Sequence, residues 1–362
     1  MILYKNGSAL IDGRLKRVDI AANHGRIIAI EREIVADEQT EVVDCSGRYV
    51  LPALVDIHTH GANGYDFNSA DYDGMKKIME FYVSHGVGTV FPTVMTDSDE
   101  TVCRQLELIA KLAKEYPEVK GIHLEGPFLS EKFCGAMPKQ YLQKPSFDKF
   151  LRYQKAADGL IRLVTVAPEL PNAIEFITEA TAHRVHVSIG HSGADGETVK
   201  KALKAGAVSF THWGNAMAEL DRHNLNVSGA ALASNTAYCE VICDGRHVNK
   251  DVLKLLVKVK GIDRVIGITD SIMAAGLPDG QYKLGVNDVT VTGGDARITG
   301  MDVRAGSTLD AYSGLANVVS FTGLPLAEAI KLWTVNPARM VGLHNRIGTI
   351  EVGKDADFIL FG

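Results

Sequence analysis

The sequence predicts a (β/α)8 barrel of the TIM type, with a small β-sandwich domain formed by the N- and C-terminal segments. Three observations lead to this α/β fold class. Between residues 51 and 340, eight β-rich runs alternate with segments of helical periodicity, which is typical of an α/β barrel. Residues 1–50 instead contain short β-rich stretches separated by turn pairs such as Asn6-Gly7. Residues 341–362 show the same pattern of short β-rich stretches around a Gly-containing turn. We therefore expect the two ends of the chain to share one small domain.

Each barrel strand is expected at a six-residue run rich in β-branched residues. Several of the intervening segments begin with Ser or Asp at a plausible N-cap and end on Gly. A doubly wound sheet is the alternative, but it usually has a Gly-rich phosphate turn after its first strand. Here the first run leads into HTHGANG, which lacks the G-x-G-x-x-G order, so the barrel is favoured. The eight runs are ALVDIH (53–58), GTVFPT (88–93), KGIHLE (120–125), RLVTVA (162–167), VHVSIG (185–190), AVSFTH (207–212), CEVICD (239–244) and VIGITD (265–270).

Composition narrows the function classes. The chain has 362 residues and a formal net charge of −6, which argues against a general nucleic-acid binder and leaves open an anionic substrate held by local cations. Its five cysteines form no C-x-x-C pair, and an odd count without a disulfide framework suits a reducing compartment. Neither a secretory leader nor an apolar run of about 18 residues is visible. We therefore expect a cytoplasmic protein with no membrane partner.

Residues suited to metal chemistry stand at the ends of six of the eight runs. The carboxyl ends of barrel strands meet at one face, where active sites are built, so we expect these side chains to converge. A lone histidine after a strand is more often structural, and the prediction rests on the joint pattern. The residues are His58 and His60 after the first run, Glu125 at the third, His191 after the fifth, His212 at the sixth, His247 after the seventh and Asp270 at the eighth. The remaining histidines near the barrel, His85, His123, His183, His186 and His344, are read as structural or solvent-facing.

Imidazole and carboxylate ligands suit Zn²⁺ or Fe²⁺. A metal held by Glu125, His191 and His212 would keep an open position for water, as catalytic sites do. The metal would lower the pKa of that water from about 15.7 towards 7. Asp270 would accept its proton and pass it to a leaving amine. These residues predict metal-assisted hydrolysis of an amide or ester, with hydrolysis of an imine-like ring bond as an alternative.

The motifs LEGPF, APE, GHS, NAM and DG-x-H follow one another in this order, after LPALVDIHTHG and before ITDSIMAAG and GTIEVGKDADFILF. On these motifs the chain resembles the N-acetylglucosamine-6-phosphate deacetylases of the amidohydrolase superfamily over essentially its whole length. The resemblance implies a divalent metal, Zn or Fe, on Glu125, His191 and His212, with Asp270 as general base and acid. It also implies that His58 and His60 form the second-metal pair that some members have, so that one or two metals are held per chain.

The resemblance further implies that the backbone around Asn215 and Ala216, together with His247, holds a sugar phosphate. Many such enzymes are homodimers in which the neighbouring subunit supplies part of the phosphate site. Related hydrolases of cyclic amides often use a modified Lys after the fourth strand. That strand here ends in VTVAPE, which has no Lys, and Glu125 takes the anionic ligand role.

Two positions depart from the family pattern. Met137 stands where the family usually has a His that polarises the scissile carbonyl, and a thioether cannot donate a hydrogen bond. His223 stands where the family usually has an Arg for the partner's phosphate, with Arg222 beside it and Lys139 as another candidate cation. The sequence ends at FILFG, where the family usually continues, so a shorter sheet or a truncated sequence is expected.

The sequence therefore predicts a metal-dependent amidohydrolase that deacetylates an N-acetylhexosamine 6-phosphate, with metal-bound water as the nucleophile. N-acetylglucosamine 6-phosphate is the expected substrate. A related enzyme acting on another N-acyl amine or sugar is one alternative. A degraded sugar-phosphate-binding regulator is another, supported only by Met137. Retention of every metal ligand and of Asp270 favours the enzyme.

Overall fold

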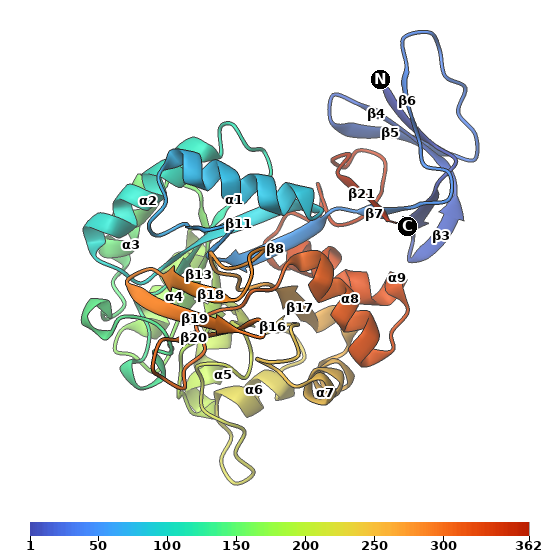
Figure 1. Ribbon diagram of the computed structural model, residues 1–362. Helices are drawn as coiled ribbons and strands as arrows, with labels where there is room; N and C mark the ends of the chain where they lie inside the picture. Colours follow the sequence, from blue (N-terminus) through green and yellow to red (C-terminus); the bar gives the residue numbers. More distant parts are fainter. Residues whose placement is uncertain (362) are drawn as a thin grey trace.

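Eight parallel strands form a barrel that helices surround in the computed structural model, which describes residues 1–361 (Figure 1). The sheet closes between its first and last strands, where the amide of Asp270 donates to the carbonyl of His58 over 2.8 Å. Each strand overlaps one of the eight predicted runs, so the predicted barrel is confirmed. In sheet order the strands are β8 (Leu54–Thr59), β11 (Val87–Met95), β12 (Ile122–Glu125), β13 (Ile161–Val166), β14 (His186–Ile189), β15 (Ala207–Phe210), β16 (Tyr238–Ile242) and β17 (Val265–Ile268).

Most of the helices begin where the sequence supplies a capping side chain. Asp71, Ser98 and Asp195, for example, each accept a hydrogen bond from an amide in the first turn of the helix that follows. Apolar residues on one face of each long helix then pack on the barrel. The helices are α1 (Tyr72–Ser84), α2 (Asp99–Leu112), α3 (Phe147–Ala156), α4 (Ala173–Ala182), α5 (Gly196–Ala205), α6 (Val227–Ala233), α7 (Lys250–Lys260), α8 (Ala311–Thr322), α9 (Leu326–Ala329) and α10 (Val335–Met340).

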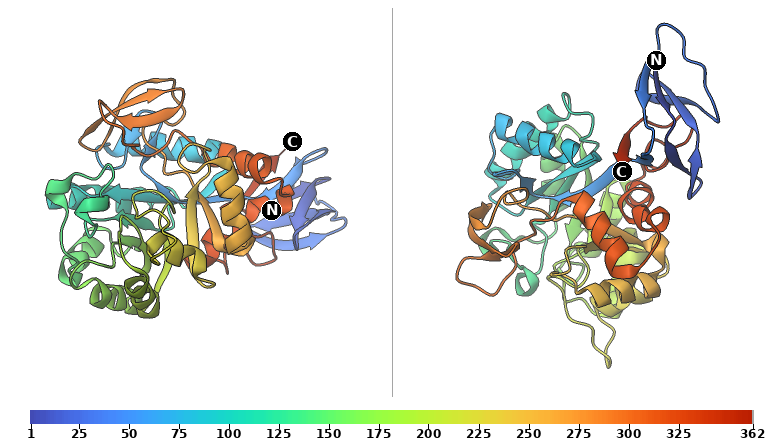
Figure 2. Two further views of the ribbon diagram at one scale, coloured as in Figure 1. Left: turned by 90° about the horizontal axis from the view of Figure 1, so that it is seen from below. Right: turned by 45° about the vertical axis from the view of Figure 1, so that its right-hand side comes forward.

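The two ends of the chain meet in a small β module beside the barrel (Figures 1 and 2). One sheet has the order β5-β4-β1-β6 and the other β21-β7-β2-β3, in which C-terminal β21 (Phe358–Phe361) pairs antiparallel with β7 (Tyr49–Pro52). Ala9, Ile20 and Val50 belong to its buried core. The module is the predicted small β domain. Its other strands are β1 (Ile2–Lys5), β2 (Ser8–Ile11), β3 (Arg14–Arg17), β4 (Asp19–Asn23), β5 (Arg26–Glu31) and β6 (Glu41–Asp44).

A third β structure interrupts the barrel between β17 and α8, and the sequence analysis did not anticipate it. Strands β18 (Gly280–Leu284), β19 (Asn287–Thr292) and β20 (Asp295–Ile298) form an antiparallel sheet. Its apolar side chains Leu284 and Val289 pack with Met95 and Met137. We call residues 280–304 the cap sheet segment, because it lies against the cavity described below. Strands β9 (Gly61–Ala62) and β10 (Tyr65–Asp66) form a short hairpin after β8.

All five cysteines are free, and Cys239 and Cys243 are buried in or beside β16, in keeping with their interpretation as packed thiols. Within residues 1–361 no helix is both long and apolar enough to cross a membrane.

Candidate active site and metal centre

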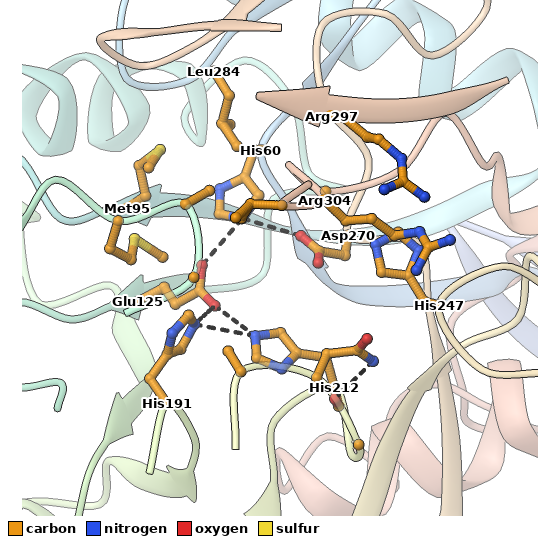
Figure 3. Close-up of a pocket in the computed structure, with 18 of the residues that line it drawn as sticks. His60, Met95, Glu125, His191, His212, His247, Asp270, Leu284, Arg297 and Arg304 are labelled. Atoms are coloured by element: carbon orange, nitrogen blue, oxygen red, sulfur yellow. Dashed lines mark hydrogen bonds and ion pairs between the residues drawn. The ribbon is translucent and has the colours of Figure 1, made fainter. Parts of the chain in front are cut away.

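The carboxyl ends of the barrel strands open into one cavity of ≈ 430 Å³ (Figure 3). His58 lies beneath this cavity, fully buried, with Nε2 3.4 Å from Oε2 of Glu125. The convergence expected from a barrel therefore brings residues far apart in the sequence to one site. The predicted site residues that line the cavity are His60, Glu125, Met137, His191, His212, Asn215, Ala216, His247 and Asp270.

Three of these residues have an unusual backbone conformation immediately after their strands. His191, His212 and Asp270 have φ angles of 48°, 33° and 47°. Positive φ is uncommon for residues with a Cβ, and such strain clusters at active sites and ligand clamps. Because all three side chains line the cavity, the strained turns are part of how the strand ends aim them inward.

Glu125 forms the first of two clusters of possible metal-ligand atoms with His191 and His212. Oε1 of Glu125 lies 3.1 Å from Nε2 of each histidine, and the two Nε2 atoms are 3.2 Å apart. Metal–ligand bonds of 2.0–2.1 Å in a tetrahedron place neighbouring ligand atoms about 3.3–3.4 Å apart. The three atoms thus have the spacing of one face of a metal tetrahedron.

The second cluster joins the other oxygen of Glu125 to His58 and His60. Oε2 of Glu125 is 3.1 Å from Nε2 of His60. In the residues that the structure describes, both ring nitrogens of His58 and Oε2 of Glu125 are buried and lack a hydrogen-bond partner. Buried polar atoms normally have partners, and divalent metals bind these atom types. The residues present therefore fit one metal ion in each cluster.

Outer contacts orient the ligands. Nδ1 of His191 donates to the carbonyl of Phe133 over 2.9 Å, which leaves the lone pair on Nε2, the atom that faces Glu125. Below the site, Oε1 of Glu240 accepts hydrogen bonds from Ser188 and Ser209 at 2.9 and 2.8 Å. The barrel interior beneath the clusters is therefore polar and ordered.

The electrostatic environment of the two clusters favours a bound cation. Burial raises the pKa of Glu125, but the charge of His58 and the close Nε2 atoms of His191 and His212 outweigh burial and hold that pKa well below its usual value. Burial lowers the pKa of His60, but the adjacent carboxylates of Asp270 and Glu125 raise it to about 9. The carboxylates thus favour positive charge on the side of His58 and His60, whose pKa values are both raised, and a divalent ion would supply that charge.

Asp270 is held firmly beside the clusters. Its Oδ1 lies 3.2 Å from Nε2 of His60 and 3.6 Å from Nε2 of His58. Its amide donates to the carbonyl of His58, and its carbonyl accepts from the amide of Ser307 over 2.7 Å. The carboxylate is consequently fixed within reach of a reacting group bound in front of Glu125.

Residues predicted to hold the substrate occupy another part of the cavity wall. Nδ1 of His247 donates to Oδ2 of Asp244 over 2.7 Å, which fixes the ring and leaves Nε2 as its remaining polar atom. Asn215 and Ala216 lie in the turn after His212, and Met137 approaches from the loop between β12 and α3. These four residues are brought together with the metal-ligand clusters.

Arg222, His223 and Lys139 are not brought to the cavity of this chain. Arg222 and His223 lie on the exposed segment between β15 and α6, which projects from the molecule (Figure 2), and Nε of Arg222 donates to Nε2 of His223. Lys139 is exposed, and its Nζ lies 4.0 Å from Oε1 of Glu131. A role for them at the phosphate site of a neighbouring subunit stays a prediction.

The cap sheet segment also supplies site residues, and none of them was predicted from the sequence. Leu284, Arg297, Val303 and Arg304 line the cavity, and Arg297 and Arg304 supply the only arginine side chains among its lining residues. The alternating pattern of residues 287–298 was a possible sign of strands. Nothing in that pattern indicated that the strands would fold over the mouth of the barrel.

Residues 49–362 match the amidohydrolase family. Among curated relatives, N-acetylglucosamine-6-phosphate deacetylase of Bacillus subtilis (strain 168) is 33% identical, over 96% of this chain and 89% of the relative. The protein of the same name from Bos taurus is 32% identical, over 99% of this chain and 91% of the relative.

Two solved structures are similar over nearly the whole chain. A mutant N-acetyl-D-glucosamine-6-phosphate deacetylase from Mycobacterium smegmatis, in complex with N-acetyl-D-glucosamine-6-phosphate, has a TM-score of 0.92 and 30% identity, covering 99% of this chain and 94% of that one. The N-acetylglucosamine-6-phosphate deacetylase from Thermotoga maritima has a TM-score of 0.89 and 29% identity, with the same coverage of 99% and 94%.

Proposed function

This chain belongs to the N-acetylglucosamine-6-phosphate deacetylase family of amidohydrolases, and we propose that it hydrolyses the acetamide of N-acetylglucosamine 6-phosphate. Water adds to the amide carbon and the carbon–nitrogen bond breaks, which gives acetate and glucosamine 6-phosphate. The observation that carries the proposal is the meeting of Asp270 with two ligand clusters that share Glu125, in one cavity.

Glu125, His191 and His212 are the ligands we assign to one divalent metal. His58 and His60, with Glu125 between the two sites, are assigned to a second. Zn²⁺ and Fe²⁺ both accept this donor set. When bound, such a metal acts as a Lewis acid that polarises a carbonyl and lowers the pKa of water.

Asp270 is the proton carrier in this proposal. Burial raises the pKa of Asp270, but the charge of His58 and the hydrogen bond from His60 outweigh it and hold that pKa below its usual value. The carboxylate is thus ionised at neutral pH and can accept a proton from the attacking water. The departing amine needs one proton, and Asp270 returns it, which restores the starting state.

The sugar phosphate is assigned to the part of the cavity lined by Asn215, Ala216 and His247. Asp244 holds the His247 ring through Nδ1, so that Nε2 is the atom available to a ligand. This arrangement supports a substrate with an amide at one end and a polar or anionic group at the other.

We assign the protein to the cytoplasm, because its five free cysteines suit a reducing compartment. We also expect a homodimer, as the family resemblance implies. Leu220 and Leu225 on the projecting segment are 63% and 45% exposed, which supports burial of this segment against a second copy. Light scattering on the purified protein would give its mass in solution.

The test is release of free amine from N-acetylglucosamine 6-phosphate by metal-reconstituted protein. The galacto epimer and unphosphorylated N-acetylglucosamine serve as comparison substrates. We expect the gluco 6-phosphate to be turned over with the highest kcat/KM. The absence of amine release from all three compounds, by protein shown to contain metal, would overturn the proposed function.

A further inference from the structure

Two arginines from the cap sheet segment occupy one side of the cavity. Arg297 lies in β20 and Arg304 follows that strand, and both line the cavity. In the view of Figure 3, both guanidinium groups lie toward the side of the cavity where His247 is drawn, away from His191. The cavity therefore has a metal-ligand end and a cationic end.

One carboxylate holds both arginines. Nε of Arg297 donates to Oδ2 of Asp295 over 2.8 Å, and Nε of Arg304 donates to Oδ1 of the same residue over 2.9 Å. Because each arginine contacts Asp295 through Nε, its two terminal nitrogens, Nη1 and Nη2, remain available to other partners. In residues 1–361, the terminal nitrogens of Arg304 make no hydrogen bond, and Arg297 uses one of its own to contact Asp302.

The two carboxylates that pair with these arginines differ in exposure. Asp295 is largely buried, with 21% of its side chain exposed, and serves both arginines. Asp302 is 93% exposed, so solvent screens its charge strongly. Asp295 and Asp302 formally balance the two arginines, and Asp302 also lines the cavity. Arg304, however, is paired only with Asp295, the carboxylate that it shares with Arg297.

Hydrogen bonds fix the cap sheet segment that carries the two arginines. Arg297 and Arg304 face each other in an antiparallel bridge. The amide of Gly285 donates to Asp66 over 2.9 Å, and Nδ2 of Asn287 donates to the carbonyl of Ala136 over 2.7 Å. These bonds tie the cap sheet segment to strand β10 and to the loop after β12. The guanidinium groups are thus positioned before any ligand binds, which reduces the entropy cost of binding.

We propose that Arg304 and Arg297 bind the phosphate of the substrate, within the same chain that carries the metal ligands. The proposal rests on the proposed function for the identity of the sugar. An N-acetylhexosamine 6-phosphate carries its amide and its phosphate on opposite sides of the ring, which matches the two ends of the cavity. Guanidinium forks bind phosphate oxygens through paired hydrogen bonds.

The test separates phosphate binding from deacetylation. Glucose 6-phosphate has the phosphate but no amide, and its binding to metal-loaded protein can be measured by calorimetry. We expect Arg304→Gln to weaken that binding by about 10- to 100-fold, and Arg297→Gln to weaken it less, because Arg297 also contacts Asp302. Arg304→Lys should restore part of the affinity, because it keeps the charge and loses the fork.

A second readout is the ratio of kcat/KM for N-acetylglucosamine 6-phosphate to that for N-acetylglucosamine. We expect this ratio to fall by a similar factor in Arg304→Gln. Arg104→Gln, at an exposed position on α2, is the matched control and should retain the wild-type ratio. Circular dichroism and metal content check that each variant folds.

The Arg222→Gln/His223→Gln double variant tests the competing site. If it loses glucose 6-phosphate binding while Arg304→Gln and Arg297→Gln retain it, the proposal is wrong. Glucose 6-phosphate binding that depends on Arg304 in a protein without deacetylase activity would uphold the phosphate site and reject only the proposed reaction. Wild-type affinity in both single-arginine variants would reject the site itself.

Discussion

Oε2 of Glu125 lies 3.1 Å from Nε2 of His60, while its other oxygen lies 3.1 Å from Nε2 of both His191 and His212. One carboxylate thus stands between two pairs of histidines. A carboxylate has two oxygens and about four lone-pair sites, so it can serve two metal ions at once. Each site is therefore expected to need its own pair of histidines for metal binding, whereas both sites need Glu125.

Metal content should follow this division. We expect metal-replete wild-type protein to contain about two ions per chain and His60→Ala about one. Glu125→Ala should lose most of both, because it removes the ligand common to the two clusters. Elemental analysis of the purified, folded variants measures this directly. His186→Ala, at the opposite end of its barrel strand β14, is the control and should keep the wild-type content. Full metal content in Glu125→Ala would show that the ligand assignment is wrong.

Asp270→Asn should separate catalysis from metal binding. The amide keeps the shape of the carboxylate but cannot accept and return a proton. We expect kcat/KM to fall by about 10²–10⁴-fold, with metal content and folding retained. Steady-state kinetics and elemental analysis on the same preparation give both quantities. An unchanged turnover in the variant would remove Asp270 from the role of proton carrier.

Much of the fold could be predicted because the barrel repeats a local rule. Each strand is a short β-rich run, and most of the long helices begin at a capping residue such as Asp71 or Ser98. Once a barrel is inferred, its topology brings the strand ends together. The approach of Glu125, His212 and Asp270 therefore followed from their positions after strands, without knowledge of any side-chain contact.

The cap sheet segment could not be predicted in the same way. Its strands have a local pattern, but their place depends on Leu284 and Val289 packing with Met95 and Met137. That contact joins residues from distant parts of the chain and leaves no spacing in the sequence. Arg304 illustrates the consequence, because it lies in no barrel strand and becomes a cavity residue only through this packing.

Met137 allows a test of whether a second metal polarises the scissile carbonyl of the substrate. This side chain lines the cavity at the position where the resemblance implies a histidine donor. Loss of one such donor typically costs about 10²–10³-fold in rate, unless another group polarises the carbonyl. We expect His60→Ala to lower kcat strongly, and Met137→His to recover part of that loss in the double variant.

In the wild-type background, Met137→His should change kcat by less than about tenfold, because the carbonyl is already polarised there. The four proteins form a double-mutant cycle, and kcat with measured metal content is the readout. Equal effects of Met137→His with and without His60 would show that the two positions act independently, contrary to this prediction.

Stability at low pH should depend on Asp99, which joins the first turn of α2 to α3. Its carboxylate accepts hydrogen bonds from Lys149 at 2.6 Å, Tyr153 at 2.6 Å and Gln143 at 3.2 Å. Burial raises the pKa of Asp99, but these hydrogen bonds outweigh burial and lower it to about 2. A carboxyl whose pKa is lower in the folded state stabilises the protein above its unfolded pKa, near 3.8.

This contribution should be lost as the pH falls from about 4 to about 2. Asp99→Asn is therefore expected to lower the melting temperature at pH 7, with a cost of order 1 kcal/mol because the ion pair is partly exposed. The deficit relative to wild type should shrink as the pH falls through that window. Thermal unfolding followed by circular dichroism at several pH values measures it. Glu100→Gln, at the exposed neighbouring position, should show no such trend, and a deficit in Asp99→Asn that is the same at pH 7 and pH 3 would contradict the electrostatic origin.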